Sequence, residues 1–247
     1  FNASYYKGID FSIPVITKLE NLQNHYGVTV AELINLQQFD EAIELIGRNK
    51  SPSKQVTAWL KALNSEYDTS INIANLITNR YFMPKENPIW QLAYPLYFWQ
   101  YILSSSTKYQ NLDPLLVAGV IRQESRFDSM ALSVSNAFGL MQLIIPTARV
   151  VASQVSIPFS SQEMLHDPKT NISLGAHYLN GLINELNNPL YAVASYNASP
   201  NAVKNWINKN KGEDLDFFVE KIPYDETRNY VKKVFSSYWT YLSLYKD

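Results

Sequence analysis

Glu124 is the acidic residue whose surroundings in the sequence best suit acid–base chemistry. Asp113 followed by Pro114 is typical of a helix start. In the helix that follows, Leu116, Val120 and Glu124 recur every four residues, so the carboxyl group shares a stripe with two apolar side chains and is expected to point inward. Burial and a place at the negative end of the helix dipole both raise a carboxyl pKa. A pKa near about 6 would allow proton donation to a glycosidic oxygen.

Taken alone, this helix also allows a simpler interpretation. Glu124 could be solvent-exposed and paired with Arg122 or Arg126. Most glycoside hydrolases need two carboxyl groups, and the sequence offers one convincing candidate. Asp128 lies four residues beyond Glu124, past the helix end in a predicted turn, and we interpret it as structural.

Four blocks of residues that include Glu124 distinguish between these interpretations. In chain order the blocks are Gln123-Glu124-Ser125-Arg126-Phe127 with Ser133 and Ala137-Phe138-Gly139-Leu140-Met141-Gln142; Asp167-Pro168, Asn171-Ile172, Gly175 and Tyr178-Leu179; Tyr196-Asn197-Ala198; and Ile222-Pro223, Glu226-Thr227-Arg228 and Tyr230-Val231. Together they resemble the motifs of the soluble lytic transglycosylase family. The resemblance covers about Leu112 to Tyr245.

Two departures from the family pattern concern loop edges. Asn136 and Ser199 stand where relatives usually carry glycine, but asparagine tolerates left-handed backbone angles and serine can cap the next helix. The usual proline after the glutamine is replaced by Ile145, with Pro146 one place later. We expect a different loop edge and an unchanged Glu124.

The resemblance implies a role for each matching residue. It makes Glu124 the catalytic acid and base. Three implied substrate-binding residues contact the sugar: Ser133 lies near an acetamido group, and Met141 and Gln142 line the sugar site, with Gln142 as a donor. Of the other implied substrate-binding residues, Tyr196 holds Glu124, Asn197 shapes its turn, Glu226 lies near the peptide stem and Tyr230 closes the site. Structural alternatives stay open. Ser133 could cap a turn, Met141 and Tyr196 could be core, and Gln142 could satisfy backbone groups.

The implied reaction is cleavage of peptidoglycan without water. The acetamido carbonyl of N-acetylmuramic acid would replace the protein nucleophile, and Glu124 would protonate the leaving oxygen and then deprotonate the C6 hydroxyl, giving a 1,6-anhydro sugar. One alternative is a goose-type-lysozyme-like hydrolase that admits water. Another is a non-catalytic glycan-binding or scaffold protein built on the helical first half.

The fold predicted from these patterns is all-α. Helical stripes with little period-two alternation run from Pro14 to about Leu103, which favours helical hairpins or a superhelical scaffold. The texture changes after Ser104-Ser105-Ser106, which places a domain boundary near Thr107. The resemblance implies a superhelical linker domain at residues 1–106 and a lysozyme-like catalytic domain at residues 107–247. Asp167-Pro168 and Ser199-Pro200 mark two further helix starts.

Composition excludes several other classes. With 21 basic and 22 acidic residues, no basic patch favours nucleic acid. There is no cysteine, and His25, His166 and His177 lack metal-ligand spacing, so neither a metal nor a cofactor is expected. No window is apolar for the ~18 residues of a membrane span. The chain begins at Phe1 without a recognisable leader, which suggests a processed chain or a fragment, and a periplasmic location follows from the resemblance alone.

Overall fold

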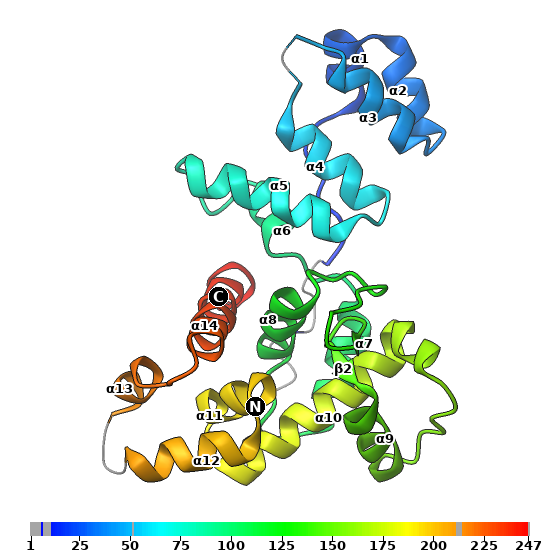
Figure 1. The fold of residues 1–247 in the computed structure, drawn as a ribbon. Helices are drawn as coiled ribbons and strands as arrows, with labels where there is room; N and C mark the ends of the chain where they lie inside the picture. The colour runs from blue at the N-terminus through cyan, green and yellow to red at the C-terminus, as the bar shows by residue number, and fades with distance from the viewer. Residues whose placement is uncertain (1–5, 7–10, 51, 211–213, 247) are drawn as a thin grey trace. The chain divides into compact units, whose positions relative to one another are not determined.

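The computed structural model describes residue 6 and residues 11–50, 52–210 and 214–246 of the chain. Two compact units are present. Residues 10–97 form the N-terminal unit, and residues 98–247 form the C-terminal unit, to which Tyr6 also belongs. Each unit is helical in the ribbon of Figure 1, and the predicted all-α fold is confirmed.

The N-terminal unit is a series of short helices, each of which packs against the next. They are α1 (Leu19–Tyr26), α2 (Val28–Asn35), α3 (Phe39–Gly47), α4 (Lys54–Leu63), α5 (Tyr67–Arg80) and α6 (Ile89–Ala93). The joint between α1 and α2 is Gly27, whose φ of +93° suits glycine. Val56, Ala58, Trp59, Leu60 and Ala62 are the buried residues of α4. The helical hairpins expected from the apolar stripes are therefore present.

The C-terminal unit contains eight α-helices in its described part and one small hairpin. The helices are α7 (Trp99–Ser106), α8 (Pro114–Glu124), α9 (Ile145–Gln154), α10 (Pro168–Leu186), α11 (Pro189–Asn197), α12 (Pro200–Lys209), α13 (Leu215–Glu220) and α14 (Asp225–Tyr245). The short 3-10 helix η2 covers Gln162–His166. Strands β1 (Ala137–Phe138) and β2 (Leu143–Ile144) pair antiparallel, with Phe138 opposite Leu143. The hairpin lies between α8 and α9 in the sequence.

Four of these helices begin with the same device. A side-chain cap at Asp113, Asp167, Asn188 or Ser199 accepts a hydrogen bond from the first turn, and a proline follows at once. Proline suits this position because its missing N–H would have no helical partner there. The starts predicted at Asp113, Asp167 and Ser199 are confirmed, including the cap by Ser199.

Helix α8 is buried along most of its length against α14. Gly119 allows the close approach, because a Cβ atom there would lie 3.3 Å from the carbonyl oxygen of Val234. At the start of α8, the carboxylate of Asp113 accepts hydrogen bonds from Tyr6 Oη at 2.8 Å and Tyr238 Oη at 3.1 Å. The position of α8 beside α14 is thus set at both its start and its middle.

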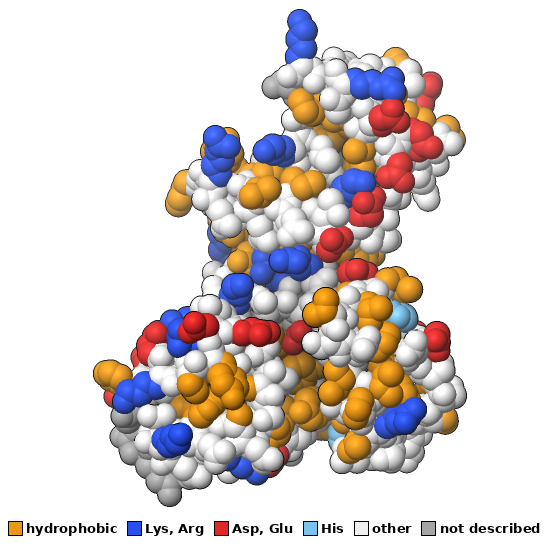
Figure 2. All heavy atoms as spheres, viewed as in Figure 1, with side chains coloured by type: hydrophobic (Ala, Val, Ile, Leu, Met, Phe, Trp, Pro, Cys, Tyr) orange, Lys and Arg blue, Asp and Glu red, His pale blue; other side chains and the backbone are white. Residues whose placement is uncertain are grey.

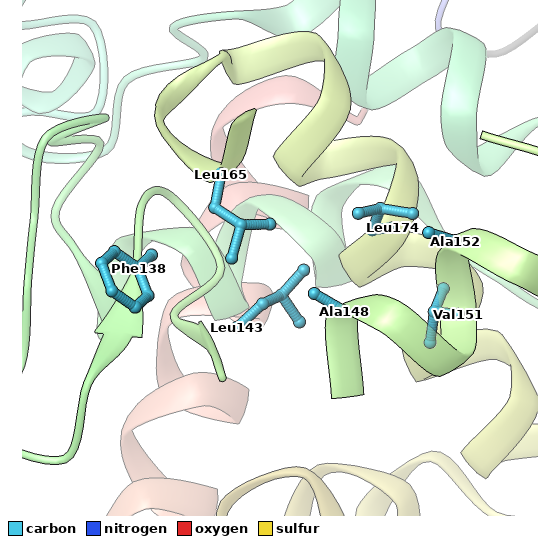
Figure 3. Close-up of a cluster of buried hydrophobic side chains, with 7 residues drawn as sticks. All are labelled: Phe138, Leu143, Ala148, Val151, Ala152, Leu165 and Leu174. Atoms are coloured by element: carbon cyan, nitrogen blue, oxygen red, sulfur yellow. The ribbon is translucent and has the colours of Figure 1, made fainter. Parts of the chain in front are cut away.

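A separate apolar cluster supports the hairpin. Figure 3 shows side chains from the hairpin, α9, η2 and α10 gathered together: Phe138, Leu143, Ala148, Val151, Ala152, Leu165 and Leu174. All seven are buried. Burial of apolar surface at roughly 25 cal/mol per Å² makes such a cluster the main local source of stability. The hairpin therefore rests on a packed base.

The compact units divide between Tyr97 and Phe98, earlier than the change of texture after Ser106. Helix α7 accounts for the difference, because it buries Trp99, Ile102 and Ser106 and packs against α10 within the C-terminal unit. Across the described residues, none of the helices combines the length and apolar character that crossing a membrane requires.

Candidate active site

Glu124 is the last residue of α8, and its carboxylate contacts α14. Tyr230 Oη donates a hydrogen bond to Glu124 Oε1 at 2.5 Å, joining residues 106 positions apart. Tyr230 is buried, whereas Glu124 keeps part of its surface exposed. Arg122, the alternative partner considered for Glu124, donates instead to Ser237 Oγ at 3.2 Å. The predicted inward orientation of Glu124 is confirmed.

The electrostatic surroundings of Glu124 favour its protonated form. Burial, the largest effect, raises the pKa of Glu124 from 4.5 to about 7. The hydrogen bond from Tyr230 opposes this rise because it stabilises the carboxylate, and the nearby charge of Glu226 adds to it. Burial and the Glu124 carboxylate in turn raise the pKa of Tyr230 well above its usual value, so Tyr230 stays a donor. At neutral pH both protonation states of Glu124 are populated.

Tyr196 does not hold Glu124 as the resemblance implied. Its hydroxyl donates to the carbonyl oxygen of Met141 at 2.8 Å, and Tyr230 makes the bond to Glu124. Tyr196 still lies close enough for the Glu124 charge to raise its pKa, although burial is the larger cause. The reason is geometric, because α14 packs beside α8, whereas the hydroxyl of Tyr196 on α11 reaches the backbone of the hairpin loop.

Gln142 and Met141 also lie differently from the expectation. Gln142 Nε2 donates to the carbonyl oxygens of Gly139 at 2.9 Å and Ala131 at 3.2 Å, so its donors are used within the protein and its carbonyl oxygen is the group left for a ligand. Met141 is fully buried, and a Cβ atom on Gly175 would lie 2.3 Å from its sulfur. Its side chain therefore packs on α10 and does not line an open surface.

Ser133 and Asn197 both hold turns in the structure. Ser133 Oγ accepts a hydrogen bond from the backbone N–H of Ala137 at 3.0 Å, which closes the loop before β1. Asn197 Oδ1 accepts from Thr227 Oγ1 at 2.7 Å and so ties the end of α11 to the first turn of α14. Thr227 directly follows the exposed Glu226 and precedes Tyr230 by three residues.

Other residues singled out in the sequence have structural roles. Asp128 Oδ1 accepts from the N–H of Met130 at 2.8 Å, which is the turn geometry expected for it. Asn136 adopts φ of +55°, the left-handed conformation anticipated where relatives carry glycine. Among the described residues, no group of three or more His, Asp or Glu side chains could hold a metal ion.

Two of the grooves in the described part of the C-terminal unit lie near the site, and neither of these two has Glu124 in its wall. One, of about 450 Å³, runs between α9 and α10 and includes Thr147 and Tyr178. The ring of Tyr178 lies 5.3 Å from that of Tyr196, so this groove adjoins the site. The other, of about 860 Å³, is formed largely by α13 and α14. Figure 2 shows hydrophobic side chains gathered over both regions, with a hollow between them.

Three residues of the site were not predicted as such from the sequence. Asn171, Ser125 and Thr227 lie within the quoted motifs, yet each is a small polar residue that carried no chemical signal of its own. All three are buried. Ser125 and Asn171 hydrogen-bond to the hairpin loop, and Thr227 hydrogen-bonds to Asn197 at the end of α11. Burial of a polar side chain is the signal that would have identified them, and it is visible in the fold alone.

Comparisons with known proteins agree with this arrangement. The model of the family described as "Transglycosylase SLT domain" matches residues 100–218. The soluble lytic murein transglycosylase of Escherichia coli K12 is 40% identical over 127 residues, which cover 49% of this chain and 20% of that protein. That of Salmonella typhimurium is 36% identical over 146 residues, covering 58% of this chain and 22% of that protein. The chain thus spans about a fifth of these relatives.

Solved structures show the same fold. The 70-kDa soluble lytic transglycosylase from Escherichia coli superposes with a TM-score of 0.70 at 27% identity, covering 95% of this chain and 38% of that one. An inactive Glu-to-Gln mutant of a lytic transglycosylase from Pseudomonas aeruginosa gives 0.65 at 26% identity, covering 91% and 36%. Residues 100–218 of this chain are thus a transglycosylase SLT domain, similar to that of the soluble lytic transglycosylases.

Proposed function

We propose that the chain cleaves the β-1,4 bond between N-acetylmuramic acid and N-acetylglucosamine in peptidoglycan and leaves a 1,6-anhydromuramic acid end. The observation that carries the proposal is a single partly buried acid, Glu124, whose pKa is raised to about 7 and whose carboxylate accepts a 2.5 Å hydrogen bond from Tyr230. A group with this pKa can donate a proton and then accept one at neutral pH.

The first step uses protonated Glu124. Its proton goes to the glycosidic oxygen as the bond to the anomeric carbon breaks, and the acetamido carbonyl of the muramic acid attacks that carbon in place of a protein nucleophile. The negative charge left on Glu124 is stabilised by the hydroxyl of Tyr230. This assistance grows as the charge develops, so it lowers the barrier more than it strengthens binding.

The second step uses the Glu124 carboxylate as a base. It takes the proton of the muramic C6 hydroxyl, whose oxygen closes onto the anomeric carbon and displaces the acetamido oxygen. Atoms balance without water, and Glu124 returns to its protonated form. The raised pKa matters here too, because a carboxylate with a pKa of about 7 is a stronger base than one with a pKa of 4.5.

The remaining site residues are proposed to bind the glycan. Ser133 lies at the edge of the hairpin, the carbonyl oxygen of Gln142 is directed to the substrate, and the exposed Glu226 meets the peptide stem. The groove between α9 and α10 beside Tyr196 gives the strand room on one side of the scissile bond. We assign this catalytic role to residues 107–247, a linker role to residues 1–106, and a periplasmic location to the protein.

The test is digestion of purified peptidoglycan followed by mass analysis of the products. Anhydro ends lighter by one water than reducing ends are expected from the wild type, and Glu124→Gln should keep the fold and glycan binding while losing turnover. Reducing ends would instead show a hydrolase of the goose-lysozyme type. Loss of turnover in Glu226→Gln on glycan without peptide stems would indicate a two-carboxylate mechanism and overturn the single-acid scheme.

A further inference from the structure

The buried amide of Asn171 is connected to the hairpin loop on both of its faces. Its Oδ1 accepts from the N–H of Met141 at 2.8 Å, and its Nδ2 donates to the carbonyl oxygens of Phe138 at 2.9 Å and Leu165 at 2.8 Å. The side chain is 1% exposed. A reversed amide would set N–H against N–H and oxygen against oxygen, so the partners define its orientation.

The rest of the loop is held in the same manner from two other helices. Ser125, next to Glu124 at the end of α8, donates to the carbonyl oxygen of Leu140 at 2.8 Å. Tyr196 from α11 donates to the carbonyl oxygen of Met141. Together with Asn171 from α10, these side chains join the loop at residues 138–142 to three helices. Buried backbone groups need such partners, and here side chains supply them.

The loop packs closely against η2 and α10. Gly139 has φ of +70°, and a Cβ atom there would lie 2.1 Å from the carbonyl oxygen of Leu165 and 2.5 Å from Asn171 Nδ2. Gly175 leaves similarly little space beside Met141. The backbone that carries Gln142 therefore packs directly on α10, and the side-chain amide of Asn171 makes the hydrogen bonds that hold it there.

We propose that Asn171 is a positioning residue for catalysis, a proposal that rests on the function proposed above. It fixes Gln142 relative to Glu124, because the loop that it holds is also bonded to Ser125 beside the catalytic acid. Asn171 does not touch the substrate in this scheme. A displacement of about 1 Å in such a constellation can cost about 100-fold in rate, so the loss should appear mainly in kcat.

The experiment compares Asn171→Ala and Asn171→Asp with the wild type on soluble glycan strands, well below the thermal transition. Aspartate keeps an acceptor for Met141 but has no N–H for the two carbonyl oxygens. Both variants should lose about 100-fold in kcat with KM changed less than about threefold. Asn180→Ala, which removes another buried amide from α10, is the matched control and should keep kcat.

Folding is followed by circular dichroism. A folded Asn171 variant with wild-type kcat overturns the proposal, as does a kcat loss equal to that of Asn180→Ala. Should both Asn171 variants fail to fold, Ser125→Ala removes a bond from the same loop at little cost in volume and should lower kcat about tenfold. An unchanged kcat there is contrary evidence.

Hydrogen exchange separates this proposal from the proposed function. Asn171→Ala leaves the Met141 N–H without its acceptor, so that amide should exchange faster than in the wild type whether or not the protein cleaves glycan. A wild type that forms no anhydro product refutes the reaction, whereas unchanged exchange at Met141 refutes the role of Asn171.

Discussion

Replacement of Glu124 by glutamine should stabilise the C-terminal unit, and the gain should depend on pH. In the unfolded chain this carboxyl group titrates near 4.5, and in the folded protein its pKa is about 7. Below pH 4.5 the group is protonated in both states and contributes nothing. As pH rises from 4.5 to 7 the unfolded chain loses the proton first, so the folded state loses stability, and the penalty is constant above about pH 7.

The magnitude follows from the width of that window. At about 1.4 kcal/mol per pKa unit the full penalty approaches about 3.5 kcal/mol, and since Glu124 keeps some solvent contact we expect about 2 kcal/mol. Glutamine is uncharged at all these pH values and can still accept from Tyr230. The gain of Glu124→Gln should therefore be near zero at pH 4 and reach about 2 kcal/mol at pH 8, which is about 4–8 °C in Tm for a protein of this size.

The assay is thermal and urea unfolding of both proteins from pH 4 to pH 8, followed by tryptophan fluorescence. Glu185→Gln is the control, because Glu185 is exposed and paired with Lys204, so its effect should be small. An equal stability of Glu124→Gln and wild type at pH 8, or a gain that is largest at pH 4, would refute the assignment of a raised pKa to Glu124.

Three further predictions concern the contacts around the site. Tyr230→Phe removes the bond that stabilises the Glu124 carboxylate, so the pKa of Glu124 should rise further by about one unit and the basic limb of the pH–rate profile should move to higher pH; a shift to lower pH would contradict this. Gly139→Ala introduces a Cβ atom 2.1 Å from a carbonyl oxygen at a positive φ and should cost more than about 3 kcal/mol in urea unfolding, which a mild loss would disprove. Thr227→Val leaves Asn197 Oδ1 without its donor and should cost about 1–2 kcal/mol, with unchanged stability as the contrary result.

Much of the helical fold could be predicted because its signals are local. A capping side chain followed by proline marks the starts of α8, α10 and α12, and each was placed correctly from neighbouring residues alone. The domain boundary expected after Ser106 stays a prediction. The compact units divide nearer the N-terminus, before Phe98, because α7 packs within the C-terminal unit. No local pattern at residues 99–106 predicts that packing.

The site itself was predicted in part. The spacing of Leu116, Val120 and Glu124 placed the carboxyl group on an apolar stripe, because residues four apart on a helix share a face. The helix alone still left a solvent-exposed Glu124 open, and the motif blocks decided for the inward orientation. The spacing could not show which groups surround that carboxyl group. In the structure, the side-chain N–H groups of Gln142 donate to backbone carbonyl oxygens, and Asn171 holds the loop. Neither role could be predicted from spacing, because both depend on turns that bring distant backbone groups together.

What the sequence by itself determined is therefore the helix that carries Glu124 and the face on which it lies, since both depend on residues within a few positions of one another. Only the tertiary structure decided that Tyr230, and not Tyr196, donates to Glu124. That pairing joins residues 106 positions apart and exists because α8 and α14 pack closely at Gly119, so the raised pKa of Glu124 is a property of the packed core.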